Sequence, residues 1–287
     1  MRERHERFVS SETAQQERRC KLCDKEIVYK FSLPLVAGLR GEYFECTNCR
    51  MLQSRHLDVL TAPGLVEIAD YDPNADLDSG AAWRMSCLAS RLEQLVKLKV
   101  VPRARSSFRA LDFGCGTGFL VSYMAHRFGW SAIGYDPFWT PAYALDKVFT
   151  EWEQVAEKAP YNLIVASEVF EHFTDPKNEL LRIRETLAKD IAFLYVTTGL
   201  YVPGKTTEGW NYLAPQSGHH VSFYARRTMQ EVARLVGASG VYQIGANYEW
   251  LFVFGERYGR WSQKVNLALA STLLGLATRS GISSVIE

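Results

Sequence analysis

The stretch LDFGCGTGFL, residues 111–120, places Gly114, Gly116 and Gly118 at alternate positions directly after an apolar, strand-like run. Glycine at every second position costs backbone entropy, which indicates that the chain needs close backbone approach here. A turn between a strand and a helix offers a ligand free N–H groups together with the positive end of the helix dipole. The sequence therefore predicts a ligand site at this turn.

Outward from this turn, β-type runs alternate with helical runs from residue 108 onward, which is typical of a doubly wound parallel sheet. The two closing β-type runs, 241–247 and 250–255, are too close together for a crossover helix and are expected to pair antiparallel. The prediction is an α/β fold: a mostly parallel, seven-stranded Rossmann-like sheet with an antiparallel final strand. Apolar residues near helical spacing also predict a helix over residues 81–100, lying on this sheet.

The front of the chain carries two CxxC pairs, CKLC and CTNC. Two such pairs, separated by a couple of dozen residues, supply the four thiolates of a zinc ribbon. The predicted ligands are Cys20, Cys23, Cys46 and Cys49. Runs 26–35 and 41–46 predict short strands between the pairs. Because four thiolates saturate the ion, we expect a structural Zn²⁺; chance pairing or redox-active cysteines are the alternatives.

Asp136 ends the second predicted strand, about 20 residues beyond the glycines, where a carboxylate can accept hydrogen bonds from both hydroxyls of a ribose. A ribose occurs in nicotinamide dinucleotides and in S-adenosylmethionine. The spacing GCGTG departs from the GxGxxG of dinucleotide enzymes. An NAD(P)-dependent oxidoreductase therefore stays as an alternative at this point.

Three features in combination, Asp112 before the glycines, SEVFEHFTDP at 167–176 and the antiparallel finish, resemble class I S-adenosylmethionine-dependent methyltransferases. The resemblance covers roughly residues 80–255. It implies S-adenosyl-L-methionine as methyl donor, with the three glycines along its methionine portion and Asp136 on its ribose. The further donor-binding residues that it implies are Asp112, Phe138, Trp152 and Ser167; a likeness of the ribbon and linker to zinc-containing sugar methyltransferases adds Tyr71, near the donor.

The order of ribbon, linker and catalytic domain resembles zinc-containing methyltransferases that act on nucleotide-linked sugars. The stretch WNYLAPQSGHHVSFYARRTM, residues 210–229, also resembles bacterial methyltransferases of glycan biosynthesis. These likenesses imply a small-molecule acceptor: a sugar, a glycan precursor or a natural product. A catalytically inactive zinc-ribbon adaptor is the alternative from the binding class.

Methyl transfer from a sulfonium is an in-line displacement, in which a hydroxyl or an acidic carbon must also lose a proton to a base, whereas an amine acceptor needs little help from a base. His172 follows the fourth strand of the predicted sheet, and His220 lies in the loop after the fifth, so both are expected at its ligand-binding edge. A hydrogen-bonded structural role is the alternative for each histidine. Nearby, Glu168 and Glu171 are expected to line the pocket or cap the following helix. Aromatic residues of the loop are expected either to contact the acceptor or to pack: Tyr201, Trp210, Tyr212 and Tyr224.

The chain has 33 Lys and Arg residues against 32 Asp and Glu residues, a balance that argues against a nucleic-acid-coating surface. No apolar run reaches the roughly 18 residues of a membrane helix, and the polar first residues predict no secretory signal. We expect a cytoplasmic monomer or homodimer. The predicted segments are a flexible N-terminus at 1–16, the ribbon at 17–58, a linker at 59–80, the methyltransferase domain at 81–258 and a C-terminal helix at 259–287.

Overall fold

The computed structural model describes residues 19–58, 79–102, 107–138, 143–244 and 248–255. Tyr71 and the predicted C-terminal helix lie outside these residues, as does nearly all of the predicted linker. Among the described helices, none combines the length and the apolar character that a membrane crossing needs.

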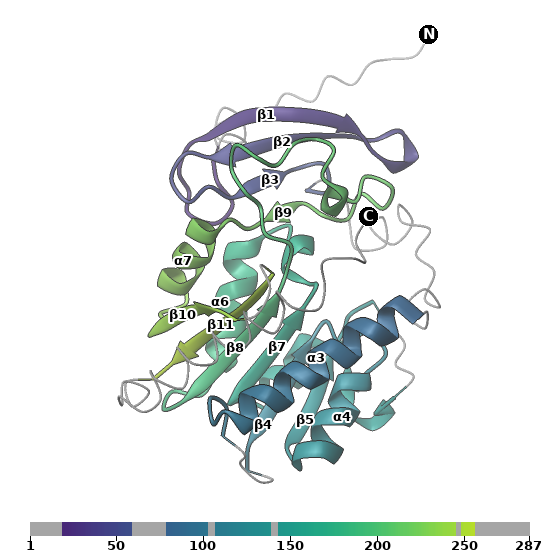
Figure 1. Cartoon of the computed structure of the whole chain (residues 1–287), viewed down its shortest axis with the longest axis vertical. Helices are drawn as coiled ribbons and strands as arrows, with labels where there is room; N and C mark the ends of the chain where they lie inside the picture. Colours follow the sequence, from purple (N-terminus) through teal and green to yellow (C-terminus); the bar gives the residue numbers. More distant parts are fainter. Residues whose placement is uncertain (1–18, 59–78, 103–106, 139–142, 245–247, 256–287) are drawn as a thin grey trace.

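The central sheet has seven strands in the order β10-β11-β8-β7-β4-β5-β6 (Figure 1). Their bounds are β4 Arg109–Phe113, β5 Ser131–Tyr135, β6 Val148–Phe149, β7 Leu163–Ser167, β8 Ala192–Thr197, β10 Gly240–Gln243 and β11 Glu249–Phe254. Strands β6, β5, β4, β7 and β8 pair parallel, whereas β11 pairs antiparallel with both β8 and β10. The predicted fold class, with its antiparallel finish, is confirmed.

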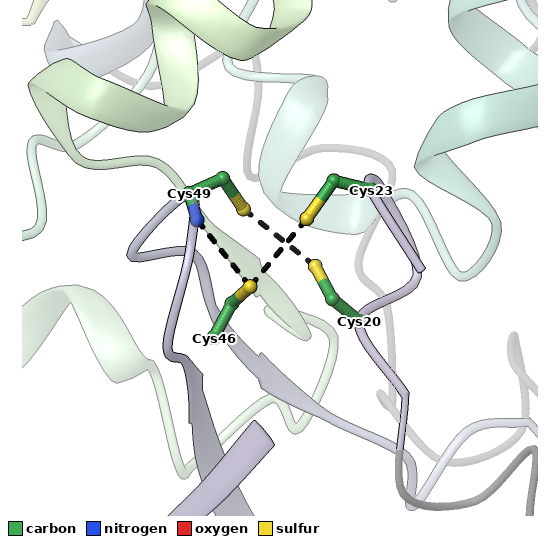
Figure 2. Close-up of side chains that lie close together, drawn as sticks. All are labelled: Cys20, Cys23, Cys46 and Cys49. Atoms are coloured by element: carbon green, nitrogen blue, oxygen red, sulfur yellow. Dashed lines mark hydrogen bonds between the residues drawn. The ribbon is translucent and has the colours of Figure 1, made fainter. Parts of the chain in front are cut away.

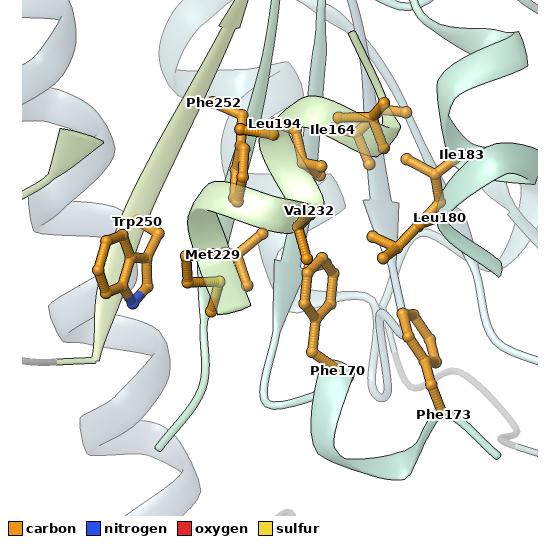
Figure 3. Close-up of a cluster of buried hydrophobic side chains, with 14 of the residues drawn as sticks. Ile164, Phe170, Phe173, Leu180, Ile183, Leu194, Met229, Val232, Trp250 and Phe252 are labelled. Atoms are coloured by element: carbon orange, nitrogen blue, oxygen red, sulfur yellow. The ribbon is translucent and has the colours of Figure 1, made fainter. Parts of the chain in front are cut away.

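Both faces of this sheet are covered by helices, as its largely buried parallel strands require. The helices are α3 Ser79–Lys97, α4 Phe119–Phe128, α5 Trp152–Ala156, α6 Pro176–Thr186 and α7 Arg226–Leu235. Side chains of β8 alternate between the faces. Phe193 and Tyr195 pack in the core with α3 and α4, and Leu194 and Val196 pack in the core with α6 and α7 (Figure 3).

Helix α6 begins with an N-cap that its sequence supplies locally. The side chain of Asp175 accepts a hydrogen bond from the backbone N of Asn178 at 3.3 Å, and Pro176 occupies the first helical turn. Because Asp175 caps the helix, the nearby Glu168 and Glu171 are not needed for capping.

A second, four-stranded sheet, here called the N-terminal sheet, has the order β1-β2-β3-β9. Its strands are β1 Ile27–Pro34, β2 Arg40–Cys46, β3 Leu52–Ser54 and β9 Ser222–Phe223. All neighbours pair antiparallel, with Leu52 opposite Phe223 and Gln53 opposite Ser222. Strands β1 and β2 match the predicted runs, but β9 comes from the segment between β8 and α7 (Figure 1). The N-terminal residues therefore do not build this sheet alone.

The two sheets also share a core. The four cysteines border it, and Met51 belongs to the same apolar cluster as Phe170 and Tyr224. The hydroxyl of Thr228, in the first turn of α7, donates a 2.9 Å hydrogen bond to the carbonyl oxygen of Cys49. The cysteine cluster consequently packs directly against the start of α7.

Candidate active site

The glycine turn lies at the point where the sheet changes its winding direction. Strand β4 pairs with β5 on one side and with β7 on the other, and ligands of such sheets bind beyond the carboxyl ends of these strands. All three glycines have positive φ angles: 74° at Gly114, 48° at Gly116 and 77° at Gly118. A Cβ on Gly114 would lie 2.4 Å from Cγ2 of Val169, and one on Gly118 would lie 2.4 Å from the carbonyl oxygen of Tyr143. Close packing within the protein thus accounts for two of the glycines.

Gly116 faces the carboxylate of Asp136. Its backbone N donates to Oδ2 at 2.9 Å, and the backbone N of Phe138 donates to Oδ1 at 3.0 Å. The ring of Phe138 is 56% exposed beside this carboxylate. Asp112 lies buried at the end of β4, where burial and the charge of Asp136 raise its pKa to about 8. The turn therefore concentrates two carboxyl groups around the partly buried backbone of the glycines.

Two other residues expected at the donor site take part in packing and hydrogen bonding. The indole of Trp152 lies edge-on to Phe113 and Tyr135, at centroid distances of 5.7 and 5.3 Å. The guanidinium of Arg182 lies 4.5 Å from the Trp152 ring centroid. The hydroxyl of Ser167 lies 2.8 Å from that of Thr197 at the end of β8. Their donor-binding roles stay predictions.

A short helical turn after β7, η4 Phe170–His172, presents the first predicted base. Phe170 and Phe173 are both buried in the core beneath α6 and α7 and anchor the turn at each end (Figure 3). Glu171 between them is fully buried, whereas the side chain of His172 is solvent-exposed. The anchored turn fixes both polar side chains at the carboxyl edge of β7.

The loop after β8 brings a second histidine to this place. The ring centroids of His172 and His220 lie 4.8 Å apart, and those of His172 and His219 lie 6.3 Å apart. Desolvation by the surrounding protein atoms, followed by the charges of His220 and His219, lowers the pKa of His172. Burial likewise lowers the pKa of His220. Both rings are therefore neutral at pH 7, and the expected meeting of the two histidines at one edge is observed.

Tyr212 joins the two glutamates of the SEVFEH segment. Its hydroxyl lies 2.7 Å from Oε1 of Glu171 and 3.0 Å from Oε2 of Glu168. Thr198 donates to Glu171 at 2.9 Å, and Thr197 donates to Glu168 at 2.9 Å. Burial, followed by the charge of Glu168, raises the pKa of Glu171 to about 8. Since a phenol carries one hydrogen, Tyr212 donates to only one of the two carboxyl groups at a time, and the other contact needs a proton on that carboxyl group.

The remaining aromatic residues of the loop serve packing. Tyr201 and Tyr224 are fully buried, and their hydroxyls donate to the Glu45 carboxylate and to the carbonyl oxygen of Phe170. Trp210 lies 5.3 Å, centroid to centroid, from the ring of Tyr212. For Tyr201 and Tyr224 the packing alternative therefore holds.

The N-terminal sheet holds the histidine-bearing loop in place. Nε2 of His56 donates to the carbonyl oxygen of Gly218 at 2.6 Å, and Nδ1 of the same ring lies 2.8 Å from the hydroxyl of Ser54. The backbone N of Ser54 donates to the carbonyl oxygen of Val221 at 2.8 Å. The backbone N of Val221 donates in turn to the carbonyl oxygen of Glu171 at 2.8 Å. His56 was not among the residues expected from the sequence, where no motif marks it.

The four cysteines converge on one point (Figure 2). The Sγ atoms of Cys20 and Cys49 lie 3.6 Å apart, those of Cys23 and Cys46 lie 3.5 Å apart, and all four lie within 4.8 Å of one another. Zn–S bonds of about 2.3 Å in a tetrahedron place sulfurs roughly 3.8 Å apart, whereas a disulfide needs about 2.05 Å. The backbone N of Cys49 also donates to the sulfur of Cys46 at 3.4 Å. This geometry fits a tetrahedral metal ion.

Comparison with known proteins places the chain in a family. The family model described as "Methyltransferase domain" matches residues 83–243. No curated protein matches the chain.

Solved structures with related folds include two methyltransferases and a cyclopropane synthase. An O-methyltransferase family protein from Burkholderia thailandensis is 12% identical, with a TM-score of 0.46 over 61% of this chain and 57% of its own. The Haemonchus contortus phosphoethanolamine N-methyltransferase 2, in complex with S-adenosyl-L-methionine, is 18% identical, with a TM-score of 0.42 over 53% of this chain and 37% of its own. The cyclopropane synthase MmaA2 from Mycobacterium tuberculosis is 17% identical, with a TM-score of 0.41 over 53% of this chain and 62% of its own. The present chain thus spans less than two thirds of the length of each.

The family model covers more than half of the chain, and its range runs from α3 to β10, through the glycine turn and both histidines. The protein therefore belongs to the methyltransferase-domain family.

Proposed function

We propose that this enzyme transfers the methyl group of S-adenosylmethionine to a hydroxyl of a small-molecule acceptor: a sugar, a glycan precursor or a natural product. The observation that carries the proposal is the turn after β4, where Gly116 and Asp136 meet at 2.9 Å at the switch point of the sheet. The acceptor class rests on the likeness of the N-terminal and loop sequences to methyltransferases of sugars and glycans. We further propose a cytoplasmic monomer or homodimer.

The donor carries a positive ammonium and a positive sulfonium group beside one carboxylate, so its net charge is positive and a negatively charged site favours it. Asp112 and Asp136 supply carboxyl groups on either side of the glycine turn. Asp136 is proposed to accept hydrogen bonds from the ribose hydroxyls in place of the N–H groups it now accepts from. The exposed ring of Phe138 is the proposed wall for the adenine.

In the transfer, an acceptor oxygen forms a bond to the methyl carbon while the carbon–sulfur bond breaks. The electron pair of that bond stays on sulfur, and the product is neutral S-adenosylhomocysteine. The acceptor hydroxyl must lose its proton, and the cluster of Glu171, His172 and His220 is the proposed site of this loss. The cluster follows β7, which is next to β4 and its glycine turn.

We propose that the four-cysteine cluster binds a structural Zn²⁺. Four thiolates leave such an ion no open position, so its contribution is to stability. The ion would hold together the N-terminal part of this sheet, whose strand β3 pairs with β9, two residues beyond His220. A separate catalytic role for this ion is not proposed.

The decisive experiment is titration calorimetry of the zinc-loaded protein with S-adenosylhomocysteine, run beside NADH. Micromolar binding of S-adenosylhomocysteine alone is the expected result. The matched control is His126→Ala on the exposed face of α4, which should bind the product as wild type does. Binding of NADH, or of neither compound, would overturn the proposed donor site. With the donor established, methyl transfer to sugar nucleotides and hydroxylated natural products identifies the acceptor.

A further inference from the structure

We propose that Glu171, His172 and His220 bind a divalent first-row transition-metal ion, at a second metal site distinct from the four-cysteine cluster. One ligand atom from each of the three side chains lies within 4.8 Å of the others. Glu171 and His172 come from the anchored turn after β7, and His220 comes from the loop that the N-terminal sheet holds. Three ligands from two segments thus already face a common point.

His220 has the orientation of a metal ligand. Its Nδ1 lies 2.6 Å from the carbonyl oxygen of Tyr212. A carbonyl oxygen only accepts hydrogen bonds, so Nδ1 carries the proton and the lone pair is on Nε2. A ring N–H donated to a backbone carbonyl is the outer contact that metal-bound histidines almost always make. The ring of His172 lies nearly perpendicular to that of His220, at an interplanar angle of 84° and a centroid distance of 4.8 Å.

Two hydroxyl groups orient the carboxylate of Glu171. Its Oε1 accepts from the hydroxyl of Tyr212 at 2.7 Å, and its Oε2 accepts from the hydroxyl of Thr198 at 2.9 Å. A carboxylate has about four lone-pair positions, so these two contacts leave it acceptor capacity for an ion. Tyr212 therefore orients two of the proposed ligands, His220 through its carbonyl group and Glu171 through its hydroxyl.

The chemistry of the ligand set selects the ion. Two imidazoles and one carboxylate suit Mn²⁺, Fe²⁺, Co²⁺ or Zn²⁺, whereas Mg²⁺ and Ca²⁺ prefer oxygen ligands. Three protein ligands leave at least one coordination position open, in contrast to the saturated four-cysteine site. The side chain of His172 is solvent-exposed, which gives an ion and an acceptor oxygen access to the cluster.

The role of the ion rests on the proposed methyl transfer. An acceptor hydroxyl bound at the open position loses its proton more readily, because the cation stabilises the alkoxide. The proton passes to solvent, the oxygen takes the methyl group, and the electron pair of the broken carbon–sulfur bond remains on sulfur. In this arrangement the two histidines promote proton loss through the ion instead of accepting the proton themselves.

Metal binding is tested first, without reference to activity. Protein whose four cysteines are loaded with Zn²⁺ is titrated with Co²⁺ by calorimetry and visible absorption. We expect one further equivalent to bind, with the weak absorption of a nitrogen and oxygen site and without the intense sulfur-to-cobalt bands of a thiolate site. Absence of a second equivalent, or thiolate bands only, would overturn the proposal.

Variants then locate the ion. Glu171→Gln keeps the size of the side chain, and His220→Ala removes one ring; each is expected to weaken Co²⁺ binding at least about tenfold. His126→Ala on α4 is the matched control and should bind Co²⁺ as wild type does. S-adenosylhomocysteine binding is measured on every variant, so that loss of the donor site or of the fold is recognised separately. Wild-type Co²⁺ affinity in both Glu171→Gln and His220→Ala contradicts the site.

Activity gives the final comparison. Mild chelation that removes the second equivalent, and leaves the four-cysteine ion, should reduce methyl transfer at least about a hundredfold, and added Mn²⁺ or Co²⁺ should restore it. Unchanged donor binding with full activity after chelation would show that the histidines act without an ion. Loss of donor binding in untreated protein would instead defeat the proposed function itself.

Discussion

The proposed donor side and the proposed acceptor side of the site are assembled in opposite ways. On the donor side, the hydrogen bond between Gly116 and Asp136 joins residues only 20 positions apart within one strand–helix–strand unit. On the acceptor side, the bond between His56 and Gly218 spans 162 positions and connects the N-terminal sheet with the histidine loop. Damage to the N-terminal sheet should therefore reach the acceptor side and spare the donor side.

The strongest test of this contrast is Cys23→Ser. Loss of one thiolate should remove the Zn²⁺ and lower Tm by about 10 °C, because a structural zinc site contributes directly to folding. Since β3 then no longer holds β9 firmly, turnover should fall at least about tenfold, while S-adenosylhomocysteine affinity stays within about twofold of wild type. Metal analysis, calorimetry and methyl-transfer assays measure the three effects.

The matched control is Cys87→Ser, because Cys87 is exposed on α3 and far in sequence from the ribbon. It should keep the wild-type metal content and Tm. A full zinc complement in Cys23→Ser would contradict the ligand set. Equal loss of donor binding and turnover would show that the two sides are not separable.

The reverse perturbation is Gly116→Val. A β-branched residue at a φ of 48° is strained by roughly 1–3 kcal/mol, and its side chain would enter the space of the donor. We expect S-adenosylhomocysteine affinity to fall about ten- to a hundredfold, measured by calorimetry, with zinc content unchanged. Gly129→Ala is the control, since Gly129 has a φ of 70° and no atom within 4 Å of an added Cβ. Wild-type affinity in Gly116→Val would remove the donor from this turn.

A milder test addresses the hydrogen bond between His56, which follows β3, and Gly218 in the histidine-bearing loop. His56→Ala removes the hydrogen bond to Gly218, a loss of about 1 kcal/mol and roughly fivefold in turnover if the loop position limits catalysis. Hydrogen exchange across 218–223 should accelerate, and S-adenosylhomocysteine affinity should not change. His126→Ala should alter none of these quantities. Unchanged exchange in His56→Ala would show that the N-terminal sheet does not need this contact to hold the loop.

The same contrast explains what the sequence could predict. The glycine turn, the seven strands and the antiparallel finish follow from periodicity and from residues close together in the chain, and the structure has them. The spacing of the cysteines was also enough to predict that their four sulfur atoms lie close together. His172 and His220 could be placed at one edge because both follow parallel strands, whose carboxyl ends share that edge.

Other features depend on contacts that no local pattern encodes. Strands β3 and β9 have three and two residues, too few for a detectable alternation, and their pairing unites segments at 52–54 and 222–223. No sequence pattern near His56 predicts its hydrogen bond to Gly218. Tyr212 reads as one aromatic residue among several in its loop, and only its carbonyl and hydroxyl contacts distinguish it.

The smallest expected effect concerns Asp112, whose pKa burial and Asp136 raise from 3.8 to about 8. Between these values the folded protein holds a proton that an unfolded Asp112 releases, so the donor-free fold loses stability as pH rises. Asp112→Asn removes the buried charge and should raise Tm at pH 8 by about 2–4 °C, the shift that about 1 kcal/mol gives in a protein of this size. It should also weaken S-adenosylmethionine binding, because one carboxylate that complements the positive donor is lost. Calorimetry between pH 5 and pH 8 should show that the gain in Tm vanishes towards low pH; a Tm that falls at pH 8 would mean that the ionised carboxylate stabilises the turn even without the donor.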